Sequence, residues 1–147
     1  MLFRLESDSI GEKRIPRDAY YGVQSLRASE NFKITGLTIH PQFIKALAEV
    51  KKACAITNEN VGVLETKLTN AIIKACDEII EGKLHDQFIT DPIQGGAGTS
   101  INMNANEVIA NRAIEILGGE KGNYNIVHPN DHVNKDRKST RLNSSHP

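Results

Sequence analysis

The sequence has no excess of charge of either sign and no long apolar run. Eighteen lysine and arginine residues balance eighteen aspartate and glutamate residues over 147 positions. A chain without a net field is not suited to binding nucleic acid or an anionic membrane surface. Its first residues, MLFRLESDSIGEK, are too charged, and their apolar run is too short, for a signal peptide or a membrane span. We therefore expect no nucleic-acid or membrane partner.

Cysteine is also scarce, which limits the chemistry that the chain can carry. Cys54 and Cys76 are the two cysteines, and neither belongs to a CxxC motif. Both fall in helical patterns, so we interpret them as buried thiols of a cytoplasmic protein rather than a disulfide or a zinc site. His128 and His132 are four residues apart, but Pro129 lies between them and no third ligand is near. The sequence therefore predicts no metal site.

The remaining composition is that of an ordinary globular domain, with 39% apolar and 24% charged residues. Its length suits one domain or one piece of a larger one. The first forty residues are expected to be irregular, with short extended runs at 33–34 and 37–39. The stretch 127–134, VHPNDHVN, is polar and is expected to form turns.

Three helices are predicted between these regions. The first begins at Pro41 and ends before Gly62, because proline suits a first helical position and glycine a helix end. Its expected apolar face is Phe43, Leu47, Val50 and Cys54. The second ends before Gly82 and carries Leu64, Leu68, Ile72, Ala75 and Ile79 on one side. Its acidic residues Asp77, Glu78 and Glu81 are expected to face solvent. Residues 85–94 follow as a loop or extended segment, interrupted by Pro92.

The third helix follows a glycine-rich loop and ends at Gly118 and Gly119. Its expected apolar face is Ile101, Ala105, Val108, Ile109, Ala113, Ile116 and Leu117. The sequence therefore predicts a mainly helical protein that begins with loops and short strands.

The loop before the third helix, QGGAGTS at 94–100, predicts an anion site. Glycines at 95, 96 and 98 let a ligand approach the main chain closely. The first N–H groups of a helix have no partner within it, and the helix dipole favours negative charge there. Thr99 and Ser100 add two hydroxyl donors. The motif is neither a P-loop nor a dinucleotide fingerprint, because it lacks the P-loop lysine and a third glycine at position 101. A carboxylate is the better candidate.

The helix itself carries four asparagines, although asparagine is a poor helix former. Asn104 and Asn111 form one polar stripe together with Ser100 and Glu107, and Asn102 and Asn106 form a second stripe. Two interpretations are open. In the structural interpretation, the side chains form a solvated face or bind main chain in a packed bundle. In the functional interpretation, they line a pocket for a small polar ligand.

Four stretches of the chain resemble one known family. They are IPRDAYYGVQSLRASENFKITG at 15–36, DQFITDPIQGG at 86–96, GGAGTSINMNANEVIANRA at 95–113 and HPNDHVN at 128–134. Together they are similar to the fumarase/aspartase superfamily, and the resemblance extends from residue 1 to about 134. It implies the N-terminal domain of that fold, with short strands and loops followed by helices, truncated before the central helical bundle.

The resemblance implies an enzyme that acts on a small dicarboxylate without metal or organic cofactor. Within the family, DPIQGGAGTS is most similar to the members that eliminate ammonia from L-aspartate to give fumarate. Class II fumarases are the alternative. By correspondence with the family motif, Thr99 donates to the β-carboxylate as it gains charge in an aci-carboxylate intermediate. Gly98 and Ser100 shape the same pocket, and Asn102 lies at its edge. His128, Asn130 and Asp131 match a second anion site.

The resemblance also implies what the chain does not contain. Family members are homotetramers with active sites assembled from three subunits, and their serine base lies on a loop that is absent here. We therefore expect no catalytic residue within 1–147, and a chain that is inactive alone and leaves apolar helix faces exposed. Residues 1–135 are interpreted as an incomplete lyase domain. Residues 136–147 resemble the translation of a sequencing adapter and are interpreted as a non-native tail. A non-enzymatic helical module that binds anions is the alternative from another class.

Overall fold

The computed structural model describes residues 2–31, 36–92 and 99–134. Four helices and one hairpin make up most of it: β1 (Phe3–Ser7), β2 (Glu12–Pro16), α1 (Val23–Asn31), α2 (Pro41–Asn60), α3 (Thr66–Ile80) and α4 (Thr99–Ile116). Two short turns complete it, the 3-10 helix η1 (His85–Gln87) and the π-helix η2 (Pro129–Val133). The mainly helical fold predicted from the sequence is confirmed.

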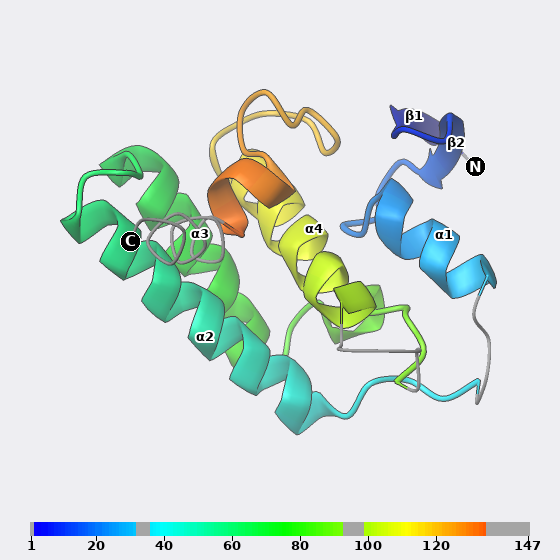
Figure 1. Cartoon of the computed structure of the whole chain (residues 1–147), viewed down its shortest axis with the longest axis horizontal. Helices are drawn as coiled ribbons and strands as arrows, with labels where there is room; N and C mark the ends of the chain where they lie inside the picture. Colours follow the sequence, from blue (N-terminus) through cyan, green and yellow to red (C-terminus); the bar gives the residue numbers. More distant parts are fainter. Residues whose placement is uncertain (1, 32–35, 93–98, 135–147) are drawn as a thin grey trace, which may run out of the picture.

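Helix α4 lies at the centre of this arrangement. Figure 1 shows α2 and α3 packed side by side on one flank of α4, with α1 and the hairpin on the other. Residues Ala105, Val108, Ile109, Ala110 and Ala113 are buried along α4, and so are several of its polar residues. A helix that is buried on nearly every side needs a partner for each polar group that it carries.

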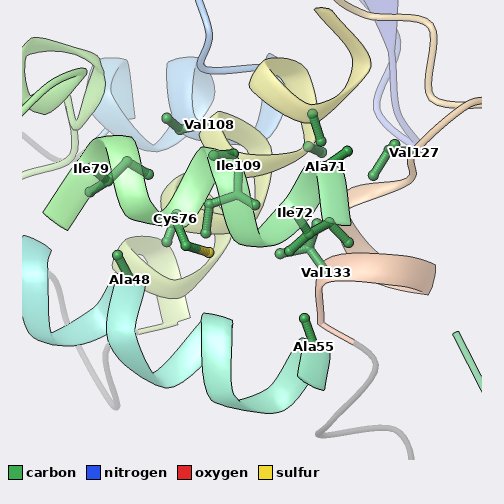
Figure 2. Packing of buried hydrophobic residues seen from close by; sticks show 14 of the residues in the cluster. Ala48, Ala55, Ala71, Ile72, Cys76, Ile79, Val108, Ile109, Val127 and Val133 are labelled. Carbon is green, nitrogen blue, oxygen red and sulfur yellow. The ribbon is translucent and has the colours of Figure 1, made fainter. Parts of the chain in front are cut away.

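The main core lies between α2, α3 and α4 (Figure 2). Ile72, Cys76 and Ile79 of α3 lie between the small side chains Ala48 and Ala55 of α2 and the α4 residues Val108 and Ile109. Alanines on α2 let the two helices approach closely, because a large side chain on one helix fits against a small one on the other. Val127 and Val133 close the core beside η2.

The predicted bounds of the three long helices agree with the structure. Pro41 occupies the first turn of α2, and the His40 side chain accepts a hydrogen bond from the Gln42 amide at 3.0 Å. Gly62 and Gly82 follow α2 and α3 with φ of 81° and 107°, values that favour glycine. The predicted buried side of α3 is also confirmed.

The predicted apolar face of α2 is wrong in part: Leu47 and Cys54 are half-buried, but the fully buried residues lie one position further along. Phe43 and Val50 are 48% and 54% exposed, whereas Ile44, Ala48, Lys51 and Ala55 are buried. Both sets have the same helical spacing, so periodicity alone did not distinguish them. The close packing against α3 selects the set that contains alanines.

The expectation of irregular structure before residue 40 is also wrong in part, because this region contains the hairpin and α1. The strands pair antiparallel, with Leu5 opposite Arg14, and their alternation is hard to recognise because Phe3 and Leu5 are exposed. The guanidinium group of Arg4 donates to the carbonyl oxygens of Pro16, Arg17, Ala19 and Tyr21. This contact fixes the segment that leads into α1. Residues 37–39, predicted as extended, form no strand, and 33–34 lie outside the described residues.

Large apolar side chains remain exposed in two parts of the chain, and Leu37 is exposed between them. The hairpin region exposes Leu2, Phe3, Leu5 and Ile10, and α2 with the loop after it exposes Phe43, Val50, Ile56, Val61 and Val63. Among the described residues, none of the helices combines the length and apolar character needed to cross a bilayer.

Candidate functional site at the start of helix α4

The candidate anion site is located where α4 begins. Thr99 is the first residue of the helix and is exposed, and Ser100 beside it is half-buried. Both hydroxyls therefore lie at the end of α4 where main-chain N–H groups have no partner within the helix and the dipole favours an anion. Gly98, the third candidate, lies outside the described residues, as do the glycines at 95 and 96.

Asn102 lies one turn further along α4 and belongs to a polar cluster. Its Nδ2 donates to Asn134 Oδ1 at 3.1 Å, and Lys51 Nζ donates to the same oxygen at 3.1 Å. Lys51 comes from α2 and is 3% exposed. The cluster therefore places a buried cation near the start of α4, where an anionic ligand would be attracted.

Sequence reasoning missed Lys51, although a signal was present. Position 51 continues the spacing 44, 48, 51, 55, which is the buried face of α2. The sequence favours Val50 instead, because an apolar residue is the usual occupant of a core position. A lysine on a buried face needs hydrogen-bond partners, which makes it a candidate for function.

The stripe of Asn104, Glu107 and Asn111 has a structural role. Asn104 Oδ1 accepts from the amides of Ile89 and Thr90 at 2.8 and 3.2 Å, and its Nδ2 donates to Gln87 O at 3.0 Å. Asn111 Nδ2 donates to Tyr20 O at 2.7 Å, and its Oδ1 accepts from the Gly122 amide at 2.8 Å. Both side chains are fully buried. A solvated face is therefore wrong for this stripe, and the binding of main chain in a packed structure is confirmed.

Glu107 stabilises the start of α1 from the same stripe. Its carboxylate is 2% exposed and accepts from the amides of Gly22, Gln24 and Ser25 at 3.0 Å each, and from the Ser25 hydroxyl. Burial raises the pKa of Glu107 in spite of these donors. An acid at a helix N-terminus complements the dipole, and here it comes from a distant part of the sequence.

A second buried acid, Glu6, completes this region. Glu6 Oε1 accepts from the Val23 amide at 3.0 Å and from the Tyr124 hydroxyl at 2.8 Å, while Arg4 Nε donates to Oε2 at 2.7 Å. Burial raises the pKa of Tyr124. Gly22 is required at this junction, because a Cβ there would lie 2.5 Å from the Tyr124 hydroxyl and 2.7 Å from Glu107 Oε2.

Asn106 differs from its neighbours on α4. It is fully buried, and neither its Nδ2 nor its Oδ1 has a hydrogen-bond partner within the described structure. Native structures contain few such groups, and each one calls for a physical explanation.

The residues of the predicted second anion site lie at the start of η2. His128 Nδ1 accepts from the amides of Asn130 and Asp131 at 3.1 and 3.2 Å, so the imidazole caps the turn. His128 and Asn130 line a cavity of about 250 Å³ together with Asp8, Glu107 and Tyr124. Asp131 is exposed and lies outside that lining. The region 127–134, expected to form turns, contains a short π-helix that begins at Pro129.

The remaining candidates have structural roles. Glu78 is not free in solvent, because Arg112 binds its carboxylate through Nε and Nη2 at 2.6 and 3.0 Å. The Arg112 hydrogen bond holds the pKa of Glu78 below its usual range. Asp77 pairs with Lys52 and Glu81 with Lys83, and Glu81 is mostly exposed. Cys76 is buried, which raises its pKa to about 12, and Cys54 is half-buried. No group of three metal-ligating side chains occurs in the described ranges.

Comparison with known proteins defines the class to which this fold and site belong. The profile of the lyase family matches residues 11–141, so the chain belongs to that family. It is a homologue of aspartate ammonia-lyases: the enzyme of that name from Bacillus sp. is 62% identical over 92% of this chain and 29% of its own length.

Two further proteins support the assignment of the chain to this family and fold. The class II fumarate hydratase of Halobacterium salinarum is 52% identical over 93% of the chain and 29% of its own length. A crystal structure described as fumarate lyase:delta crystallin from Brucella melitensis superposes with a TM-score of 0.88 and 53% identity, covering 90% of this chain and 29% of that one. The family and fold expected from the sequence are confirmed, and the chain spans about three tenths of the length of these relatives.

Proposed function

We propose that the longer protein to which this chain belongs eliminates ammonia from L-aspartate to give fumarate. The observation that carries the proposal is the 62% identity to a protein named aspartate ammonia-lyase over 92% of this chain. The match includes α4 and the residues at its start. In the reaction a base removes a proton from the carbon next to the β-carboxylate. The C–N bond then breaks, its electrons leave with the amine, and the C=C bond of fumarate forms.

The start of α4 would stabilise the β-carboxylate during proton removal. That proton is weakly acidic, so the carboxylate must accept further negative charge as the C–H bond breaks. The Thr99 hydroxyl and the first-turn amides of α4 would be the donors, and one such donor contributes about 3 kcal/mol to a transition state. Ser100 and Gly98 would extend the pocket, and Asn102 would border it. Lys51 and Asn134 support this placement, because they set a cation and an amide beside Asn102.

The base itself would come from a residue outside this chain. The family resemblance implies a serine on a loop beyond residue 147, in a homotetramer whose active sites combine three subunits. The exposed apolar side chains of α2 support further packing partners. Size-exclusion chromatography with light scattering on the longer protein tests this. A tetramer agrees with the proposal, and a stable, active monomer contradicts it.

Hydration of fumarate is the second candidate function, because the chain is 52% identical to a class II fumarate hydratase. Assays on aspartate and on malate distinguish the two functions. The longer protein, amplified from the source locus, should release ammonia from L-aspartate and give no more than a trace of fumarate from L-malate. Turnover of malate above that of aspartate would replace the first function by the second. Turnover of neither would favour an anion-binding module without enzymatic activity.

The second anion site at His128, Asn130 and Asp131 remains part of the proposal. An anion there would receive the Asn130 and Asp131 amides only after displacing His128 Nδ1 from them. Fumarate binding to the longer protein, measured by calorimetry, should lose one class of site in the His128→Leu variant. Unchanged stoichiometry would remove the site from the account.

Residues 136–147 are proposed to be a non-native tail, although the family match extends to residue 141. Resequencing of the source locus decides this. A reading frame that departs from DRKSTRLNSSH after about residue 135 supports the interpretation, and the same codons in the genome defeat it.

A further inference from the structure

The segment that leads from η1 towards the glycine motif is buried but has no regular secondary structure. Phe88, Thr90 and Asp91 are 3%, 0% and 5% exposed, and residues 88–92 belong to no helix or strand. The main-chain groups of such a segment lack the partners that a helix or a sheet would give them. Side chains around the segment must therefore supply those partners.

Asn104 of α4 supplies three of them. Its Oδ1 accepts from the amides of Ile89 and Thr90 at 2.8 and 3.2 Å, and its Nδ2 donates to the carbonyl oxygen of Gln87 at 3.0 Å. An amide side chain can do this because it carries the same donor and acceptor as a peptide group. One buried side chain thus holds the main chain at both ends of the stretch 87–90.

The segment that Asn104 holds continues into the candidate anion site. Asn104 lies in the second turn of α4, and Thr99 is the first residue of that helix. The chain leaves Asn104 at Thr90 and returns to α4 at Thr99, so the stretch with the glycine motif begins and ends beside the first two turns of one helix. Figure 1 shows the segment after α3 running beside the beginning of α4. The direction in which the chain approaches Thr99 therefore depends on the contact with Asn104.

Asn111 makes the same kind of contact further along α4. Its Nδ2 donates to the carbonyl oxygen of Tyr20 at 2.7 Å, and its Oδ1 accepts from the Gly122 amide at 2.8 Å. Asn104 and Asn111 are both fully buried. The segments that Asn111 holds precede α1 and follow α4, and neither leads into the glycine motif. A comparison of the two positions therefore separates a contribution to folding from a contribution to the site.

We propose that Asn104 is a positioning residue for the reaction at the start of α4, an inference that rests on the proposed function. By holding Ile89 and Thr90, it fixes the main chain that leads to Thr99 before the substrate binds. The donors to the β-carboxylate are then in place when that group gains charge, so the reaction does not have to order them. Asn104 itself contacts no substrate atom and acts through the segment that it holds.

Kinetics of two matched variants of the longer protein test the proposal. Asn104→Ala and Asn111→Ala should both lower the stability to urea, because each removes a buried amide that holds main chain. Only Asn104→Ala should also lower kcat for L-aspartate, by about tenfold, since a small displacement of a donor costs much of its effect. Its KM should change by less than about threefold, because the lost interaction acts mainly in the transition state. Equal kcat in the two variants, or a loss confined to KM, would overturn the proposal.

Hydrogen exchange on the unsubstituted longer protein is a second test, and it does not depend on how a variant folds. Without ligand, the Ile89 and Thr90 amides should exchange within about tenfold of the rate of the Gly122 amide, which Asn111 holds. Fumarate should leave their rates unchanged. Fast exchange that fumarate slows would overturn the proposal, because the segment would then be held only after the ligand binds.

Failure of the proposed function is distinguished by the substrate. If the longer protein turns over L-malate instead of L-aspartate, the proposed function fails, and a selective loss of kcat for malate in Asn104→Ala still supports the positioning role. If the unsubstituted protein releases ammonia from L-aspartate and the two variants have equal kcat, the positioning role fails and the proposed function stands.

Discussion

The two flanks of helix α4 differ in how completely their polar groups are paired. On the flank toward α1 and η1, Asn104, Glu107 and Asn111 are buried and every one of them has several partners. On the flank toward α2 and η2, Asn106 has no partner in the described structure, and Asn102 shares Asn134 with Lys51. Polar residues on one helix can thus serve opposite purposes. The first flank fixes the fold of this chain, and the second carries a buried amide that has no partner in the described structure.

Because the two flanks differ in this way, we expect their substitutions to affect different properties, stability for one and function for the other. A fully paired buried network stabilises the fold because it holds chain segments in place, and the loss of one member leaves the others unpaired. We therefore expect substitutions on the first flank to change unfolding, with Asn104 changing turnover as well, and substitutions at the start of α4 to change binding and turnover with little effect on unfolding.

Removal of the Glu107 carboxylate should have the largest effect on stability. Glu107→Leu leaves three amides and the Ser25 hydroxyl without an acceptor, and we expect a loss of about 4 kcal/mol. Urea denaturation of the longer protein measures it. Glu49→Leu, at an exposed position of α2, is the control and should change little. A Glu107 variant as stable as the control would contradict the claim that the paired flank of α4 stabilises the fold.

The close approach at Gly22 should come next. Gly22→Ala places a Cβ against the hydroxyl of the half-buried Tyr124 and the buried Glu107 carboxylate, and overpacking of this kind costs about 2–3 kcal/mol. Gly62→Ala is a useful control because it has open space but a φ of 81°, so it should lose about 1 kcal/mol from backbone strain alone. Equal losses for the two variants, in thermal or urea unfolding, would show that the junction is not tightly packed.

The Glu78–Arg112 ion pair should have the smallest effect, and it should depend on pH. Arg112 lowers the folded-state pKa of Glu78, so the pair stabilises the protein above the unfolded carboxyl pKa of about 4.3. That stability disappears as the pH falls toward the lower folded-state value. Glu78→Gln should therefore lose about 1 kcal/mol at pH 7 and almost nothing once the pH has fallen through the lowered folded-state pKa. The free energy of unfolding is measured by urea denaturation at several pH values. A loss for Glu78→Gln that does not change with pH would contradict an electrostatic origin.

Much of the fold could be predicted from the sequence, because its signals are local. Pro41, Gly62 and Gly82 mark helix ends by restricting or extending the φ that the chain can adopt. The hairpin and α1 could not be predicted in the same way. Arg4 binds four carbonyl oxygens of the segment before α1, and Glu107 stabilises its first turn from a distant helix. Neither contact leaves a pattern within the segment that it stabilises.

The candidate site was predictable in part for the same reason. The glycine–hydroxyl motif before α4 is contiguous, so its chemistry can be deduced from spacing. Lys51 and Asn134 lie far away in the sequence and reach Asn102 only through the packing of α2 and η2 against α4. The asparagines of α4 look alike in the sequence, and only their neighbours in space distinguish those that hold the fold from Asn106, which has no partner among the described residues.

Steady-state kinetics of Thr99 variants tests the central claim most directly. In the longer protein, Thr99→Val should lower kcat/KM for L-aspartate by about two to three orders of magnitude, because it removes one donor to the β-carboxylate while leaving the melting temperature nearly unchanged. Thr66 offers a matched control, since it is the exposed first residue of α3 as Thr99 is of α4. Thr66→Val should leave the kinetics unchanged. A loss of less than threefold for Thr99→Val would contradict the role proposed for the start of α4.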